Sequence, residues 1–540
     1  MPKKAMCMRV ALGIARNTTM SALDFDWFPN LFCKAVVEGL RSNKTLRILS
    51  MSGRYRNFVG VAMAEALGEN ATLRAFRFQS QSCGDKTGVA LAKALDNNLT
   101  LQSFTFCGRR RVGDVSVAAL AAALQRNVTL RSFELGARDL NISYRAGMAM
   151  ADALRVNANL LSFKLQACSL VGDEICVALA HNCTLQSFSL SLFGPSVDIC
   201  EALALALQWN RTLRSFSLYV AMFTFGDEAG LALADALVRN ATLQSFSFEA
   251  WGTAMSDATG VAMARALGRN ATVQSFKFQE ARSEISDATG VAMGEVLKRH
   301  ATLRSFAFRS FTLGDKTGVA MAEALTQNAV LRSFALEARV SDVTGVAIAE
   351  AMNLNVTLRS LTFQPVFCSS RSVSDVTGVA LAGALRQNTS LQSFTFNVSK
   401  YGRISEDHFR AVMDSAFRQN VTLLACRVGQ LRWDISCGAV AEYVVRNQAV
   451  RAQMRTLAQL ARWSENTGFH SLVERCFRSR ILAYFLPPLC KWTPFDFVGG
   501  MSGIVWHPCG TGRGGVPGAG GASNLSVAVP CPKRRRITDS

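Results

Sequence analysis

One short stretch and four separate side chains of the C-terminal part hold residue types that could do chemistry on a ligand. The stretch "GTGRGG" at 510–515 matches the spacing G-x-G-x-x-G, whose glycines let a backbone approach phosphates. Near it stand His507, Cys509, Cys490 and Cys531, which are metal-ligating residue types. The glycine stretch neither follows a strand pattern nor opens a helix pattern, and the His and Cys spacing fits no regular zinc site. We therefore predict no catalytic residues, no cofactor and no metal.

A second group of reactive types recurs along the chain. The boxes "SDATG" and "GDKTG" place a carboxylate beside a hydroxyl, and Asn240-Ala241-Thr242 in "RNATLQSFSF" (239–248) is an N-glycosylation acceptor sequence. Both patterns return, for example as "RNATVQSFKF" at 269–278. A box that recurs in fixed phase indicates a structural unit, so we interpret these residues as parts of helix and strand ends.

The recurring Asn defines a repeat that covers nearly all of residues 8–450. Successive copies lie 25 to 33 residues apart. The aligned positions are Asn17, Asn43, Asn70, Asn98, Asn127, Asn157, Asn182, Asn210, Asn240, Asn270, His300, Asn328, Asn355, Asn388 and Asn420, with a degenerate Asn447 after them. Periods of this length are typical of solenoids, in which each unit packs only on its neighbours.

Each repeat is expected to contain a helix and then a strand, as residues 257–278 illustrate. Residues 261–269 lack proline and place Val261, Ala264 and Leu267 on one helical face. We predict that Asp257 caps the start of this helix and that Asn270 ends it in the left-handed conformation. In the strand half, Phe276 and Phe278 alternate with polar residues and should enter the core. The residues equivalent to Asp257 are Asp85, Asp227, Asp287, Asp315, Asp342 and Asp375.

The helix–strand unit and its Leu-x-x-Leu-x-Leu spacing, as in "GVAMAEALTQNAVLRSFAL" (318–336), resemble the leucine-rich repeat of the ribonuclease-inhibitor type. NOD-like receptors carry similar repeats, but no nucleotide-binding module accompanies them in this sequence. The resemblance implies an α/β solenoid of about 15 repeats, shaped as a horseshoe. Parallel strands are spaced more closely than packed helices, so the strands should line the concave face and the helices the convex face.

Composition and tail segments complete the expected organisation. We predict a leucine-rich-repeat solenoid over 1–450, a helical C-terminal cap over 451–497, and a Gly-rich disordered tail over 498–540. No signal peptide or membrane-spanning run is recognised, and the fifteen cysteines show no paired spacing. These features favour the cytoplasm, or the nucleus if the basic end, Lys533, Arg534, Arg535 and Arg536, is a nuclear-localisation signal.

Residues that could select a partner should lie where the copies differ. On the concave face these are the outward strand positions and the residues just past the strands. The candidates are Glu134, Lys164, Arg214, Tyr219, Glu249, Lys277, Gln279, Arg304, Arg309 and Glu337. Basic residues at the strand starts form a ladder that is either a solvated row or a track for acidic partners: Arg47, Arg74, Arg131, Arg214, Arg304, Arg332 and Arg359.

We hypothesise a non-enzymatic scaffold or adaptor that binds a protein on its concave face. The net charge of +20 favours an acidic partner. One alternative is a regulator of a small GTPase, because the repeats are similar to those of Ran GTPase-activating protein, although that family's acidic segment is replaced here by a basic tail. Another is a nucleic-acid-associated scaffold that uses the basic surface and tail. Neither a membrane nor a small-molecule substrate is expected.

Overall fold

The computed structural model describes residues 2–26, 30–108, 112–137, 141–167, 169–170, 173–194, 197–221, 225–366, 373–398, 405–430, 433–434 and 443–448. The chain divides into two compact units, Met1–Val450 and Arg451–Ser540. All described residues belong to the first unit. The helical cap expected over 451–497, the tail over 498–540 and the basic residues at 533–536 therefore lie outside the described residues.

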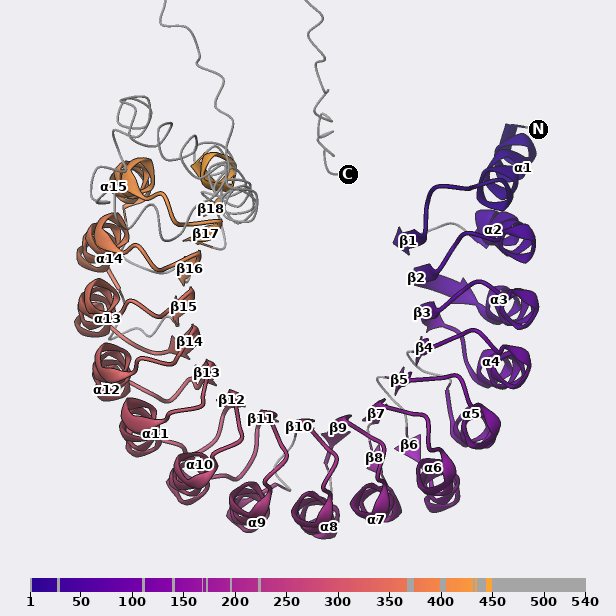
Figure 1. Cartoon of the computed structure of the whole chain (residues 1–540), viewed down its shortest axis with the longest axis horizontal. Coiled ribbons are helices and arrows are strands. Elements are labelled where there is room, and N and C mark those ends of the chain that lie inside the picture. The colour runs from indigo at the N-terminus through magenta and orange to yellow at the C-terminus, as the bar shows by residue number, and fades with distance from the viewer. Residues whose placement is uncertain are drawn as a thin grey trace, which may run out of the picture. The chain divides into compact units, whose positions relative to one another are not determined.

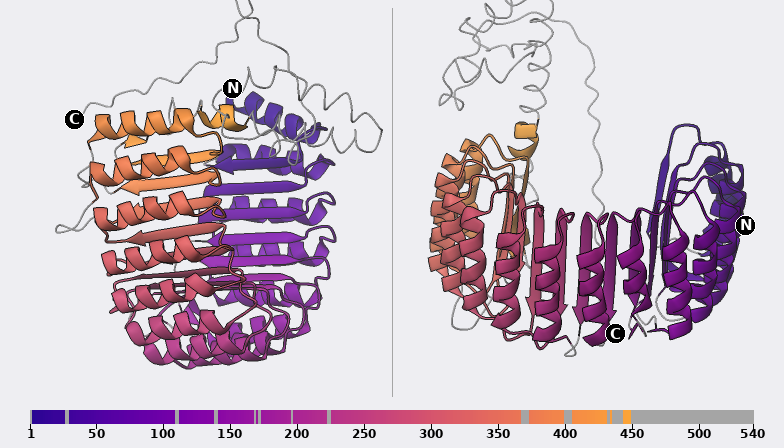
Figure 2. Two further views of the ribbon diagram at one scale, coloured as in Figure 1. Left: turned by 60° about the vertical axis from the view of Figure 1, so that its left-hand side comes forward. Right: turned by 60° about the horizontal axis from the view of Figure 1, so that its bottom comes forward.

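The first unit is built around one sheet whose strands follow one another in chain order. The sheet has sixteen strands, from β1 to β18, with β6 and β8 set apart as a separate pair. Every pairing from β1 to β17 is parallel, and β18 alone is antiparallel to its neighbour. Within this unit the strands line the inside of a curve and the helices stand along its outside (Figure 1). Figure 2 shows the same two layers from other sides.

The helices recur once per repeat, and most span thirteen residues. Their bounds are α1 Pro2–Ala15, α2 Asn30–Ser42, α3 Asn57–Glu69, α4 Asp85–Asn97, α5 Asp114–Arg126, α6 Tyr144–Val156, α7 Glu174–His181, α8 Val197–Trp209, α9 Asp227–Arg239, α10 Asp257–Arg269, α11 Asp287–Arg299, α12 Asp315–Gln327, α13 Asp342–Leu354, α14 Asp375–Gln387 and α15 Glu406–Gln419. Within the described residues, no helix combines the length and the apolar character needed to cross a membrane.

The strands are short and begin at a common Ser in most repeats. Their bounds are β1 Ala22–Asp26, β2 Ile48–Arg56, β3 Ala75–Ser82, β4 Ser103–Gly108, β5 Ser132–Ala137, β6 Asn141–Ile142, β7 Ser162–Ala167, β8 Ser169–Leu170, β9 Ser187–Phe193, β10 Ser215–Ala221, β11 Ser245–Trp251, β12 Ser275–Ala281, β13 Ser305–Arg309, β14 Ser333–Ala338, β15 Ser360–Pro365, β16 Ser393–Val398, β17 Ala425–Gln430 and β18 Trp433–Asp434. This arrangement confirms the predicted α/β leucine-rich-repeat solenoid with parallel strands on the concave side.

A continuous row of phenylalanines forms the core between the two layers. From β3 to β14, the first Phe of each strand in this sheet stacks on its counterpart in the next strand, with ring centroids 5.7 to 6.4 Å apart. Both Phe276 and Phe278 are fully buried, as the alternation predicts. On the helix side of the core, Met263 is fully buried and Val261 is only half-buried. The face of α10 that packs into the core therefore lies nearer Met263 than the sequence pattern predicts. The row consists of Phe76, Phe104, Phe133, Phe163, Phe188, Phe216, Phe246, Phe276, Phe306 and Phe334.

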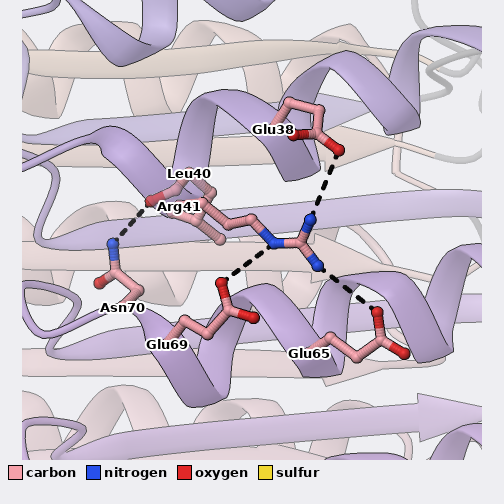
Figure 3. Close-up of polar contacts among 6 residues, drawn as sticks. All are labelled: Glu38, Leu40, Arg41, Glu65, Glu69 and Asn70. Atoms are coloured by element: carbon pink, nitrogen blue, oxygen red, sulfur yellow. Dashed lines mark hydrogen bonds and ion pairs between the residues drawn. The ribbon is translucent and has the colours of Figure 1, made fainter.

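The Asn that ends each helix works differently from the prediction. Asn240 has φ −79° and ψ 123°, which is extended and not left-handed backbone. Its Oδ1 accepts from the amides of Thr242 (2.9 Å) and Leu243 (2.9 Å), and its Nδ2 donates to the carbonyl of Leu207 one repeat earlier (2.7 Å). The side chain therefore satisfies the helix end of the previous repeat. Figure 3 shows the equivalent bond from Asn70 to the Leu40 carbonyl.

The Asp at each helix start also acts across repeats, which corrects the predicted role of Asp257. Helix α10 is capped by Ser256, whose side chain accepts from the Ala258 amide. Asp257 instead reaches the next helix and accepts from the backbone amides of Ser286 (2.9 Å) and Thr289 (3.2 Å) and from both hydroxyls. An Asp therefore caps the helix that follows its own, at the positive end of that helix dipole.

Glycine completes this contact between helices. A Cβ on Gly260 would lie 2.0 Å from Oγ1 of Thr289, so only glycine lets the two helices approach this closely. The "DATG" box thus connects neighbouring repeats, and we call it the Asp–Thr–Gly lock. Its Asp caps the helix of the next repeat, its Thr hydroxyl donates to the Asp of the previous repeat, and its Gly leaves room for the Thr of the next repeat. Its carboxylate and hydroxyl are bonded to one another across repeats, which agrees with a structural role.

Candidate functional site

The concave side of the sheet carries most of the predicted partner-binding residues. The buried Phe positions alternate with half-exposed ones along β9 to β14. Because the helices cover the other face, the half-exposed positions form the concave surface. Three of the ten candidates, Lys164, Tyr219 and Glu249, line one open groove of about 840 Å³ that runs across the strands from β2 to β11.

Small and amide side chains make up the rest of this groove. Gly53, Gly108 and Gly136 line the groove without contributing a side chain to it. The other lining residues are Ser52, Gln79, Ser80, Gln81, Cys107, Gln166, Ser189, Ser191, Phe193 and Ser217. Such a surface offers hydrogen-bond donors and acceptors over many strands, and it presents little bulk to exclude a second chain. Ser189 and Ser217 occupy the outward strand positions that the alternation predicts, whereas the lining residues on β2 and β3 were not predicted.

Six of the predicted residues pair with one another across neighbouring strands. Lys164 Nζ lies 2.7 Å from Glu134 Oε1. Lys277 Nζ lies 2.6 Å from Glu249 Oε1. Glu134 stands directly opposite Lys164 in the register, whereas Lys277 stands opposite Ser247 and reaches Glu249 diagonally.

The third pair, Arg309 and Glu337, sits further along the sheet. Their atoms Nε and Oε1 are 3.2 Å apart, while the guanidinium also lies over the Phe311 ring at 4.8 Å. Burial raises the pKa of Glu337 above its ordinary value, and the Arg309 charge offsets this only partly. All three pairs neutralise charge locally, so they do not form the basic track that the net charge suggested.

The remaining candidates are spread over the sheet. Tyr219 packs against Phe193 with ring centroids 5.6 Å apart, and burial, followed by the Glu249 charge, raises its pKa. Gln279 stands between Glu249 and Arg309 in the register. Arg304 lines a second groove of about 370 Å³ at the strand starts, with Gln244 and Gln274 beside it. Arg214 is exposed, away from the first groove.

The arginine ladder is partly structural. Arg47, Arg131 and Arg359 donate to backbone carbonyls in the following repeat, at 3.0, 3.0 and 2.7 Å respectively. Arg214 and Arg304 have neither a hydrogen bond nor an ion pair from their side chains within the described residues. Arg214 and Arg304 are therefore available to an acidic partner, whereas Arg47, Arg131 and Arg359 are engaged with the backbone, so the ladder is not a continuous basic track.

Cys107 is a groove residue whose pKa is shifted. Burial, aided by the Glu134 charge, raises the pKa of the Cys107 thiol to about 11, so this thiol is protonated at neutral pH. Within the described residues, no cluster of His, Cys, Asp or Glu is arranged to hold a metal ion. The candidates His507 and Cys509, with Cys490 and Cys531, and the stretch at 510–515 lie outside the described residues.

The helix-start carboxylates are the other perturbed acids. Burial raises the pKa of Asp227, Asp257 and Asp342, but hydrogen bonds from Ser and Thr of the next repeat outweigh it and hold each below its ordinary value. These groups are ionised caps on the helix layer, away from the concave surface. Their lowered pKa values therefore result from helix capping, which is a structural role.

No family model matches the chain, and no curated protein matches it. Among solved structures, a chain of the yeast Rad7–Elc1 complex is similar over 75% of this chain and 90% of that chain, with 16% identity and a TM-score of 0.44. Actin-binding site 2 of leiomodin-1 is similar over 26% of this chain and 78% of that chain, with 24% identity and a TM-score of 0.23. At these values neither structure indicates what this chain binds.

Proposed function

We propose that this chain is a non-enzymatic interaction scaffold that binds a protein partner on its concave face. The groove from β2 to β11 supports this proposal most directly, because it is long, open and lined by side chains that form hydrogen bonds. A partner that spans many strands would contact a different residue combination on each of them. Repeat solenoids use such extended surfaces to bind large partners.

The chemistry of the groove favours binding over reaction. Its carboxylate Glu249 and its lysine Lys164 are both ion-paired, Lys164 with the neighbouring Glu134, and its thiol Cys107 is protonated at neutral pH. The groove also lacks strong net charge, so we expect recognition by shape and hydrogen bonds. The resemblance to ribonuclease-inhibitor-type repeats is in keeping with this function.

We further propose that the chain works in the cytoplasm or nucleus. The Asn of the recurring acceptor sequence is buried, with Asn240 only 1% exposed and both sides of its amide hydrogen-bonded. A glycan at that position would break the contact between repeats. Cys83, Cys107, Cys176, Cys183 and Cys200 are free thiols, as a reducing compartment allows.

A pair of charge swaps tests the concave surface. Exchanging both charges, Glu134→Lys with Lys164→Glu, keeps the ion pair but reverses the local field, and surface pairs of this kind contribute only about 1 kcal/mol or less. The matched control is Asp235→Arg with Arg239→Asp, which swaps an exposed ion pair on helix α9. Proteins that copurify with each full-length variant are then quantified by mass spectrometry.

We expect the swap in the groove to remove specific proteins that the wild type and the helix control both retain. Thermal unfolding of both variants should stay close to that of the wild type. If all three proteins retain the same set, the groove is not the binding surface and the proposal is wrong.

A further inference from the structure

A cluster of aromatic and arginine side chains lies at the strand ends on the concave side. Trp251 continues the outward alternation of Ser245, Ser247 and Glu249 and is 41% exposed. Its ring meets the Phe311 ring edge-on, with centroids 6.4 Å apart. The Arg282 guanidinium lies 5.9 Å from the Trp251 ring centroid. We call Trp251, Arg282, Arg309 and Phe311 the rim cluster.

Arg282 holds an unusual backbone conformation. Its φ is 65°, and it is the one non-glycine residue with positive φ within the described residues. The register pairs Trp251 with Ala281, so Arg282 occupies the position that Gly252, with φ 63°, fills in the repeat before it. Side chains rarely adopt this conformation because Cβ meets the backbone, and glycine is the ordinary choice. The fold alone therefore does not explain an arginine here.

Strained positions of this kind are found where a side chain serves a function. The Arg282 side chain is exposed and has no carboxylate at ion-pair distance within the described residues. Arg309, by contrast, is already paired with Glu337. Arg282 is thus the cation of the rim cluster that is available for an anion, and the exposed face of Trp251 beside it is available for an apolar group.

We propose that the rim cluster anchors a segment of the protein partner that carries one acidic residue beside an apolar one, with the Asp or Glu side chain on Arg282 and the apolar side chain on Trp251. The proposal rests on the proposed function and adds the place and the chemistry of recognition. Tryptophan and arginine are the residue types that dominate binding energy at interfaces. Planar guanidinium groups bind carboxylates through two parallel hydrogen bonds.

The nearby charge favours a protein segment over nucleic acid. Glu284 is exposed two residues beyond Arg282. A phosphodiester chain carries a charge at every nucleotide, so its successive phosphates would be repelled by this carboxylate. A peptide with one acidic residue beside an apolar one avoids that repulsion.

The test selects peptides from a random library displayed on phage, using the full-length chain as bait. Selected peptides are measured against the wild type, Arg282→Gln, Arg282→Gly and the control Arg265→Gln. Arg265 is exposed on helix α10, and its substitution changes the charge equally. Thermal unfolding of each variant and binding of a single-stranded oligonucleotide are measured alongside.

We expect the selected peptides to carry Asp or Glu next to an apolar residue. Their affinity should fall about tenfold or more for both Arg282 variants, as loss of a charge-assisted hydrogen bond requires, and stay unchanged for Arg265→Gln. Arg282→Gly should unfold at a temperature no lower than the wild type, because glycine relieves the left-handed backbone.

Three results would overturn the inference. The first is that selected peptides bind the Arg282 variants as tightly as the wild type. The second is that the library yields no peptide with Asp or Glu. The third is that oligonucleotide binding depends on Arg282 and peptide binding does not. None of these results depends on the groove swap at Glu134 and Lys164. If the groove swap removes bound proteins but the Arg282 variants bind peptides as the wild type does, the proposed function stands and only this inference is rejected.

Discussion

At the scale of single residues, His300 shows how strictly the repeat defines a side-chain role. It replaces the Asn of the other copies and makes the same bonds, because its Nδ1 accepts from the amides of Thr302 (3.4 Å) and Leu303 (3.2 Å) while Nε2 lies 3.1 Å from the Leu267 carbonyl. These contacts assign the neutral tautomer with its proton on Nε2. Protonation would place a second N–H against two amide donors.

His300 therefore predicts a pH-dependent stability. Burial lowers the pKa of His300 below its ordinary value, although backbone bonds to Leu267 and Asn270 oppose this. Its contribution is complete above the unfolded pKa of about 6.5 and is lost as pH falls toward the lower folded value. We expect His300→Asn to become progressively more stable than the wild type from pH 7 to pH 5, as urea unfolding would measure. Parallel stability curves for the two proteins would contradict this.

Much of the residue pattern follows from the sequence, and the predictions that failed share one cause. The core positions of Phe276 and Phe278 were predicted correctly, because alternation is visible within one strand. The roles of the helix-ending Asn and of Asp257 were predicted wrongly, because their partners lie one repeat away, at a distance of roughly thirty residues that only the packing of the copies determines. The ion pairs among the concave candidates were not predicted, because they depend on strand register.

At the scale of elements, neighbouring helices are held at close range by the Asp–Thr–Gly lock. Gly345 of α13 faces Thr377 of α14, and a Cβ there would lie 2.1 Å from Thr377 Oγ1. Gly383 lies within α14 with no atom in reach of such a Cβ. Substitution of Gly345 therefore tests the close packing between helices, and substitution of Gly383 tests helix propensity alone.

Alanine substitutions at these positions should act in opposite directions. Gly345→Ala should lower the free energy of unfolding by about 1–3 kcal/mol, because the added methyl overpacks the contact. Gly383→Ala should raise it by about 0.5–1 kcal/mol, because alanine favours the helix. Urea unfolding followed by circular dichroism would measure both. A stabilising Gly345→Ala would show that the helices do not approach as closely as the lock requires.

The rim cluster was not predicted, although a signal for it exists. Alternation continues past the second Phe of β11 and brings Trp251 to the concave side, and "WGTAMS" differs from the corresponding loops of the other copies. The contact of Trp251 with Arg282 and Phe311 depends on loops from three successive repeats. Their lengths vary, so single-sequence reasoning could not place these side chains together.

At the scale of the first unit, sixteen strands in chain order create a surface far larger than any one repeat. Repetition defines the scaffold, while the concave rows vary from copy to copy. The groove from β2 to β11 and the rim cluster on β11 to β13 lie along this variable surface. We propose that a protein partner binds on that side and not on the helices.

Site-specific photo-crosslinking tests this claim most directly. A benzoylphenylalanine is introduced at Ser191, in the groove, or at Arg265, on the outer helix layer, and the full-length chain is irradiated in cells. We predict that a defined partner protein is crosslinked from position 191 and is absent from position 265. Crosslinking of that partner from position 265 without any adduct from position 191 would contradict the account.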